Sequence, residues 1–174
     1  MIIFRFTSDI HKQLLVLGSN AKKIGFVPTM GALHNGHLHL VNMSKQSADI
    51  TVCSIFVNPT QFNDQADFRK YPNTPESDIA LLERASADVL FIPEVNAVYA
   101  DGTENLEKYE LGRLESVLEG KYRPGHFQGV CQVMSRLLRF VRPHKLFMGQ
   151  KDYQQCMVIS KLLSWNHFKI SLQR

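Results

Sequence analysis

The chain has 174 residues, a net charge of +4 and a hydrophobic fraction of 44%, which is the composition of an ordinary globular protein. This length predicts one domain that buries roughly 70% of its unfolded surface. The apolar runs are shorter than the roughly 20 residues that span a bilayer, so we expect no membrane association. The charge is mildly basic and lacks a lysine or arginine block, which favours an anionic small molecule over nucleic acid.

Strand and helix signals alternate along the first half of the chain. Residues 24–27 predict the first strand, and a helix follows over 36–46. The β-branched run over 50–57 predicts a strand that is buried on both faces. A loop over 62–74 then leads to a helix that begins near Pro75 and to a short strand over 89–92.

The second half continues the alternation after an irregular region. Within 96–121 we expect a strand near Tyr109 and a helical turn near Val117. A long helix over 127–141 follows, and then strand 145–148, helix 152–164 and strand 168–172. The pattern predicts an α/β fold: one domain over 1–174 with a doubly wound, Rossmann-like parallel sheet and helices on both faces. In such folds ligands bind beyond the carboxyl ends of the strands.

Cysteine usage and the first residues indicate the compartment. Cys53, Cys131 and Cys156 lie in separate apolar stretches without a Cys-x-x-Cys pair, so we expect three core thiols and no disulfide or zinc site. No secretory signal is visible at the start, which favours the cytoplasm. Four histidines without patterned partners are predicted to be ordinary surface or core residues: His11, His39, His144 and His167.

The turn after the first predicted strand carries the clearest chemistry. Gly31 and Gly36 let the backbone approach a ligand, and the following helix directs free N–H groups and its positive dipole end to the same place. The spacing of these glycines is that of a Walker A loop, but His37 and Leu38 replace its lysine and hydroxyl residue, so that reading fails. His34-x-Gly-His37 remains, which is the signature of the HxGH nucleotidyltransferase superfamily.

Four segments in order resemble the pantothenate synthetase (pantoate–β-alanine ligase) family. They are VPTMGALHNGH over 27–37, SIFVNPTQF over 54–62, RPGHF over 123–127 and GQKDYQQ over 149–155. The resemblance implies ATP-dependent joining of pantoate to β-alanine through a pantoyl-adenylate, with release of AMP and pyrophosphate. It implies ATP as substrate, Mg²⁺ through the ATP chemistry, and a homodimer.

The resemblance also implies site residues. His37 and His34 are implied as catalytic, and Gln61 and Gln155 as ligands of pantoate. Residues implied to line the ATP site are Met30, Gly31, Ala32, Leu33, His34, Asn35, Gly36, His37, Gly149, Gln150, Lys151 and Asp152. The family usually has Glu where this chain has Gln150. On the residues alone, Asp152 is also a good helix N-cap, and no His, Cys, Asp and Glu cluster has metal-ligand spacing.

Two alternatives stay open at this level. Other HxGH nucleotidyltransferases share the signature, although Gln61, Gln155 and the 123–127 segment favour the ligase. The family also continues beyond a strand like 168–172 into a second, smaller domain. We therefore expect that its C-terminal domain is absent here and that this chain binds ATP and pantoate with little or no catalysis.

Overall fold

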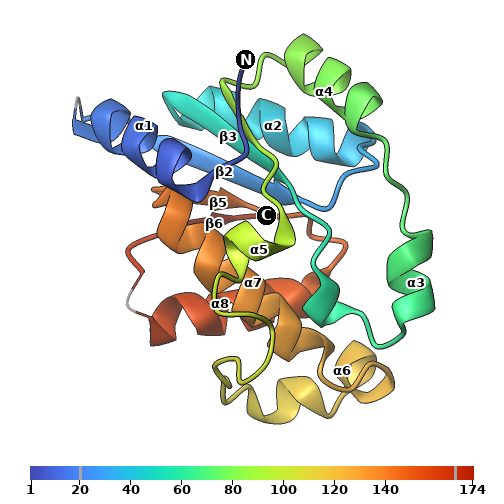
Figure 1. The fold of residues 1–174 in the computed structure, drawn as a ribbon. Coiled ribbons are helices and arrows are strands. Elements are labelled where there is room, and N and C mark those ends of the chain that lie inside the picture. The colour runs from blue at the N-terminus through green and yellow to red at the C-terminus, as the bar shows by residue number, and fades with distance from the viewer. Residues whose placement is uncertain (20, 167) are drawn as a thin grey trace.

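The computed structural model describes residues 1–19, 21–166 and 168–174, and these form a six-stranded, wholly parallel sheet (Figure 1). The strand order is β1-β4-β3-β2-β5-β6. The strands are β1 (Ile2–Phe4), β2 (Ile24–Thr29), β3 (Ile50–Ile55), β4 (Val89–Phe91), β5 (Lys145–Phe147) and β6 (Ser171–Gln173). The predicted α/β class with a doubly wound parallel sheet is therefore confirmed.

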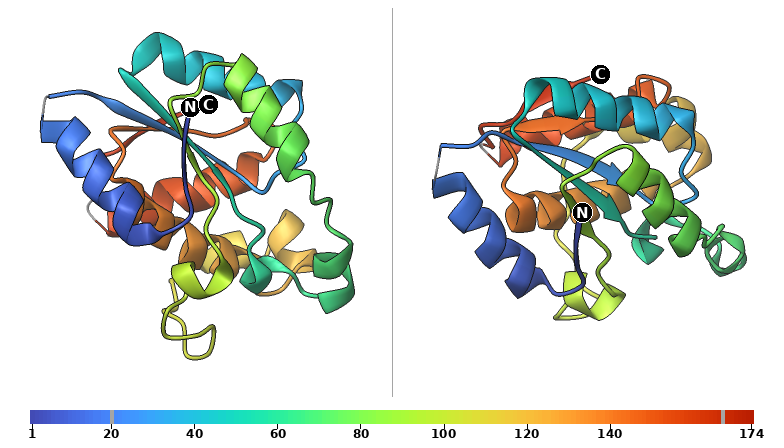
Figure 2. Two further views of the ribbon diagram at one scale, coloured as in Figure 1. Left: turned by 45° about the horizontal axis from the view of Figure 1, so that its top comes forward. Right: turned by 90° about the horizontal axis from the view of Figure 1, so that it is seen from above.

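Helices cover both faces of the sheet (Figure 2). Helices α2 and α4 pack on one face, and α1, α7 and α8 pack on the other. The α-helices are α1 (Thr7–Ser19), α2 (Asn35–Ser47), α3 (Gln65–Lys70), α4 (Pro75–Arg84), α5 (Val95–Val98), α6 (Leu118–Tyr122), α7 (His126–Val141) and α8 (Tyr153–Trp165). The described residues also form the short 3₁₀ helices η1 (Pro59–Gln61) and η2 (Gly112–Glu115).

The alternation of side chains along each strand builds two hydrophobic cores. Phe26 points to the core beneath α1, α7 and α8, while its neighbour Val27 points to the core beneath α2 and α4. Val52 and Cys53 on β3 divide in the same way. Because both faces are covered, every residue of β3 is buried, as its continuous apolar run predicts.

The path of the chain through the sheet creates a switch point between β2 and β5. From β2 the chain proceeds to β3 and β4 on one side, and it later returns to β5 and β6 on the other. The helices that follow β2 and β5 therefore lie on opposite faces of the sheet. In doubly wound folds, ligands bind at the carboxyl ends of the two strands where the helices diverge in this way. The turns after β2 and β5 are those with the implied ATP-binding residues.

Several predicted elements differ from the structure. Helix α1 and edge strand β1 precede the strand that we predicted to be first, and α3 interrupts the predicted 62–74 loop, where the side chain of Asp64 caps it. No strand forms among residues 103–111, all of which are described. The Gln128 side chain bonds both the N–H and the carbonyl of Tyr109, at 2.9 and 2.7 Å, and so occupies the groups that a ladder would need. His167 lies outside the described residues.

Candidate active site

The turn between β2 and α2 has a backbone that few residues adopt unaided. Gly31 has a φ of 87°, and the next residue, Ala32, has a φ of 50° in the left-handed region. Glycine tolerates such angles at no steric cost, whereas alanine is strained there. The Thr29 hydroxyl accepts a hydrogen bond from the Gly31 N–H at 3.2 Å, which closes the turn from its start.

His34 and His37 form a reciprocal cap at the N-terminus of α2. His34 Nδ1 accepts from the Gly36 N–H at 3.1 Å, and His37 Nδ1 accepts from the His34 N–H at 3.4 Å. The ring centroids lie 4.2 Å apart. An Nδ1 that accepts a backbone N–H carries no proton, so the neutral ring of each histidine holds its proton on Nε2. Both Nε2–H groups are then free to donate to a ligand.

His37 is poised to act as a neutral donor. Burial lowers its pKa below the ordinary 6.5, and the neighbouring His34 lowers it further, while the negative charges of Asp78 and Asp152 oppose the shift. The neutral imidazole therefore predominates at pH 7. The influence of Asp152 also shows that the turn after β5 lies within electrostatic reach of His37.

The second turn, after β3, is held by a buried asparagine. Asn58 is 1% exposed, its Oδ1 accepts from the Tyr99 hydroxyl at 2.7 Å, and its Nδ2 donates to the Gly129 carbonyl at 3.1 Å. These bonds tie η1 to α5 and α7. In the sequence this residue stands out only as part of the 54–62 segment, and its full burial is the property that local sequence does not reveal.

Gln61 connects the second turn to the first. Its Oε1 accepts from Asn58 Nδ2 at 3.2 Å, and its Nε2 lies 3.1 Å from the sulfur of Met30. A thioether is a weak acceptor, so the amide N–H groups keep capacity for a better partner. The backbone carbonyl of Gln61 lies 2.9 Å from Nδ1 of His126, whose side chain is buried and which opens α7. The two predicted site residues Met30 and Gln61 are thus brought into contact.

The third turn, after β5, is open to solvent. A Cβ on Gly149 would meet no atom within 4 Å, and Lys151 is exposed without a salt bridge among the described residues. Asp152 occupies the N-cap position of α8, but its side chain makes no capping hydrogen bond, so the expected capping role is wrong. The carboxyl group of Asp152 is exposed instead, at the same sheet edge as His37.

Two neighbouring glutamines of α8 have different surroundings. Gln154 is buried, and its amide bonds the carbonyls of Leu114 and Val117 and the N–H of Glu119, which fastens the η2–α6 segment. The half-buried side chain of Gln155 makes no hydrogen bond within the described part of the chain. The predicted substrate ligand is therefore the glutamine whose amide is available.

Asp78 is not predicted from the sequence, yet it contacts the first turn. It lies on α4, is 1% exposed, and accepts from the N–H groups of Ala32 and Leu33 at 2.9 and 2.8 Å. The sequence places it 41 residues after His37, inside an ordinary amphipathic helix. The one available signal was a carboxyl group on the apolar side of α4, a turn before Leu82.

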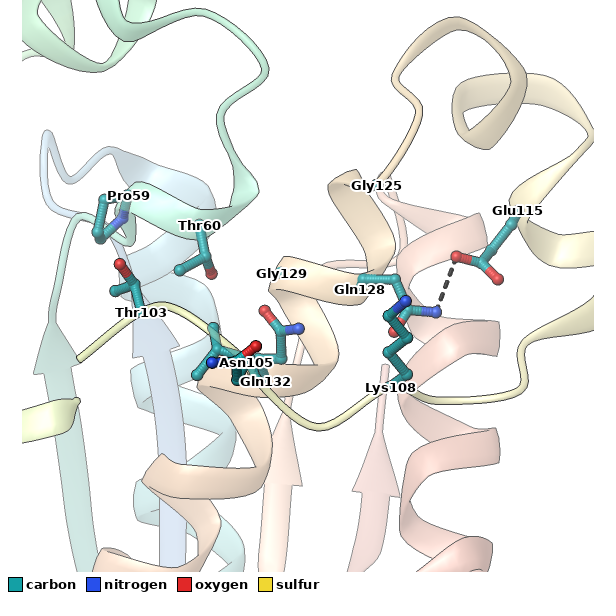
Figure 3. Close-up of a pocket in the computed structure, with 11 residues that line it drawn as sticks. Pro59, Thr60, Thr103, Asn105, Lys108, Glu115, Gly125, Gln128, Gly129 and Gln132 are labelled. Carbon is teal, nitrogen blue, oxygen red and sulfur yellow. Dashed lines mark hydrogen bonds between the residues drawn. The ribbon is translucent and has the colours of Figure 1, made fainter. Parts of the chain in front are cut away.

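A cavity of about 760 Å³ lies apart from the implied ATP and pantoate residues (Figure 3). Its lining is Pro59, Thr60, Thr103, Asn105, Leu106, Lys108, Glu115, Gly125, Gln128, Gly129 and Gln132. Gln128 spans part of it with a 2.8 Å hydrogen bond to Glu115. None of the predicted site residues lines this cavity, and we assign it no part in the site.

Two further properties concern metals and membranes. Among residues 1–19, 21–166 and 168–174, no group of three or more His, Cys, Asp or Glu side chains could hold a metal ion. None of the described helices combines the length and the apolar character needed to cross a bilayer. All three cysteines are buried free thiols, as predicted. Burial raises the pKa of Cys53 and of Cys131 to about 12.

Comparison with known proteins agrees with this fold and shows the family of the chain. The family model for pantoate–β-alanine ligase matches residues 3–174. Pantothenate synthetase of Bacteroides fragilis is 42% identical over 172 residues, which cover 99% of this chain and 60% of that protein. The enzyme of Porphyromonas gingivalis is 44% identical over 164 residues, 94% of this chain and 58% of that protein. This chain thus spans about 60% of the length of these curated relatives.

Solved structures give the same result. Pantoate–β-alanine ligase from Francisella tularensis, complexed with β,γ-ATP and β-alanine, superposes with a TM-score of 0.95 at 42% identity and covers 99% of this chain and 66% of that one. Pantothenate synthetase from Thermus thermophilus has a TM-score of 0.91 at 38% identity, over 99% of this chain and 60% of that one. The fold is an α/β, Rossmann-like parallel sheet that carries an HxGH turn after β2. The chain belongs to the pantoate–β-alanine ligase family.

Proposed function

We propose that this chain is a nucleotide-binding domain that holds ATP and pantoate for the synthesis of pantothenate. The observation that carries the proposal is that the turns after β2, β3 and β5 lie together at the carboxyl ends of the strands. Met30 of the first turn contacts Gln61 of the second, and His37 of the first lies within electrostatic reach of Asp152 of the third. The switch point between β2 and β5 is where a doubly wound sheet binds its ligand.

The proposed reaction has two steps. An oxygen of the pantoate carboxylate attacks the α-phosphorus of ATP, and the bond from that phosphorus to pyrophosphate breaks. The amine of β-alanine then attacks the acyl carbon of the pantoyl-adenylate, the bond to AMP breaks, and the amine loses a proton as the amide forms. Activation is needed because a carboxylate is a poor electrophile, and the adenylate supplies a good leaving group.

The described residues suit the first step. The Nε2–H groups of His34 and His37, together with the N-terminus of α2, would donate to phosphate oxygens as negative charge moves onto pyrophosphate. Lys151 would add a positive charge on a flexible side chain from the turn after β5. Donors fixed in place before the reaction stabilise this developing charge without having to reorganise.

Pantoate is proposed to bind between the second and third turns. It carries hydroxyl groups and a carboxylate, which pair with the amide groups of Gln61 and Gln155. Met30 would supply an apolar contact beside Gln61. Mg²⁺ is proposed to arrive with the phosphates of ATP. It would neutralise their charge, and Asp152, which is exposed, is the carboxylate that the implied ATP-site residues offer it.

The related structure from Francisella tularensis supports this proposal through its bound β,γ-ATP and β-alanine. The three buried, free cysteines support a reducing compartment such as the cytoplasm. A homodimer, which the family resemblance implies, stays part of the proposal, and sedimentation velocity of the purified chain tests it.

The test is a pair of measurements on the 174-residue chain. Calorimetric titration with ATP in the presence of Mg²⁺ should show one binding site, and any exchange of labelled pyrophosphate into ATP, which we expect to be slow in this chain, should require pantoate. Absence of ATP binding would refute the proposed site. Nucleotide transfer that proceeds without pantoate, onto a phosphate-bearing acceptor, would favour a different HxGH nucleotidyltransferase activity.

A further inference from the structure

The buried carboxyl group of Asp78 makes contacts that an ordinary surface helix would not require. Its Oδ1 accepts from the Leu33 N–H at 2.8 Å. Its Oδ2 accepts from the Ala32 N–H at 2.9 Å and from the Thr74 hydroxyl at 3.2 Å. No salt bridge to Asp78 occurs among the described residues. A carboxyl group that is 1% exposed without a cation is costly to bury, so these donors compensate its desolvation.

The two backbone bonds act where the first turn is strained. Ala32 has a φ of 50°, which an alanine does not adopt without compensating contacts. Gly31 packs so closely on Asp78 that an added Cβ would lie 3.1 Å from its Oδ2. The turn then enters α2 within two residues of Leu33, so any shift of this backbone moves His34 and the helix N-terminus together.

We propose that Asp78 is the positioning residue of the nucleotide turn: its carboxyl group holds the backbone of Ala32 and Leu33 so that the N-terminus of α2 and the ring of His37 face the phosphates. This inference rests on the proposed function. Asp78 itself need not touch the nucleotide, because its oxygens point at the turn. Its charge also acts on His37, whose pKa it raises against the effect of burial.

The chain offers a matched control in Asp88. Its Oδ2 accepts from the Thr51 N–H at 2.7 Å, and it pairs with Lys45 at 3.0 Å. Asp88 therefore also fastens a backbone N–H with a carboxyl group, but it does so beside the first residues of β3 and β4, at the sheet edge opposite the turns. Replacement of either aspartate by asparagine is isosteric and removes one charge.

The experiment compares Asp78→Asn and Asp88→Asn in the 174-residue chain. Asp78→Asn should speed amide hydrogen exchange at Ala32 and Leu33, lower the His37 pKa measured by NMR, and weaken ATP binding by about 10-fold to 100-fold, the range for a lost hydrogen bond to a charged group. Asp88→Asn should speed exchange at Thr51 and leave ATP affinity within about twofold of the parent chain, since only the far edge loses a bond.

Three outcomes would overturn the inference. They are ATP affinity in Asp78→Asn within twofold of the parent, unchanged protection at Ala32 and Leu33, or equal losses of ATP affinity in the two variants. If the parent chain does not bind ATP, the proposed function fails, while amide exchange and the His37 pKa still decide the role of Asp78. If Asp78→Asn does not fold, Thr74→Val removes one donor to Oδ2 alone. That variant should speed exchange at Ala32, and an unchanged rate there would refute the inference.

Discussion

The two nitrogens of His37 have separable tasks, and two substitutions divide them. Nδ1 accepts from the His34 N–H at 3.4 Å and belongs to the turn, whereas Nε2 carries the proton that we propose to reach phosphate. Asparagine places an acceptor near the position of Nδ1 and nothing at Nε2. Glutamine reaches the position of Nε2 with an amide donor. His37→Asn should therefore keep the turn and lose the donor, and His37→Gln should do the reverse.

The expected magnitudes follow from the number and kind of bonds. A hydrogen bond to a charged group contributes about 1.5–3 kcal/mol, so His37→Asn should weaken ATP binding by about tenfold or more. Charge grows on pyrophosphate in the transition state, where removal of one fixed donor costs about 10²–10³ in rate. Loss of the Nδ1 acceptor should have a smaller effect, because that hydrogen bond is long and exposed. We expect His37→Gln to lower the free energy of unfolding by about 0.5 kcal/mol.

Pantoate-dependent exchange of pyrophosphate into ATP reads the adenylation step alone. The substitutions are compared in a parent chain that also carries the C-terminal domain of the family, because the 174 residues alone are expected to catalyse little. The exchange rate should fall by about 10²–10³ in His37→Asn and by less than tenfold in His37→Gln. Urea unfolding should show that His37→Gln is the less stable of the two variants. Exchange in His37→Asn near that of the parent chain would remove Nε2 from the mechanism. Exchange that is lower in His37→Gln than in His37→Asn would assign the main task to Nδ1 and to the turn.

Gln61→Ala and Gln155→Ala should each weaken pantoate binding by about 0.5–1.5 kcal/mol and leave ATP binding nearly unchanged in separate calorimetric titrations; equal losses for both ligands would contradict the proposed pantoate contacts. Burial lowers the pKa of both His37 and His126, so below about pH 6.5 the unfolded chain binds more protons at these histidines than the folded chain does. The free energy of unfolding should reach its plateau above about pH 6.5 and should decline as the pH falls below that value. Equal urea midpoints at about pH 7.5 and 5.5 would contradict this expectation. Gly129→Ala should destabilise the chain by about 1–3 kcal/mol, measured by urea unfolding, because the new Cβ would overlap the backbone of η1; an unchanged midpoint would show that this contact can relax.

Periodicity predicted the sheet and the principal helices because their apolar side chains repeat with the geometry of the element. The inner residues of α2 are buried as expected, and the continuous apolar run of β3 is buried throughout. The strand predicted near Tyr109 does not form, for a reason unrelated to periodicity. Its backbone is satisfied by the amide of Gln128, a partner 19 residues away that no local pattern reveals.

The candidate site divides along the same line. The side chains that we propose to face a ligand, such as His34 and Lys151, are exposed and stand in short motifs after strands, which is why the sequence alone points to them. Residues that hold the turns were missed, because their partners are backbone groups brought close only by the fold. The expected capping by Asp152 was wrong in the opposite sense: the position at the start of α8 was right, but its carboxyl group makes no bond to the helix.

The buried polar residues explain how loops can carry a precise site. Asp78 binds the first turn, Asn58 binds the second, and His126 contacts the carbonyl of Gln61 at 2.9 Å. Each of these three side chains links a turn to an element of the packed core. Each does so through hydrogen bonds to the backbone of the turn or within the turn. Once the backbone of a turn is fixed in this way, only the rotatable bonds of the reactive side chain remain to be restricted. The third turn has no such anchor among the described residues beyond Cys156, whose thiol contacts the Gly149 carbonyl at 3.5 Å. We therefore expect the segment around Lys151 to be the part of the site that ATP itself orders.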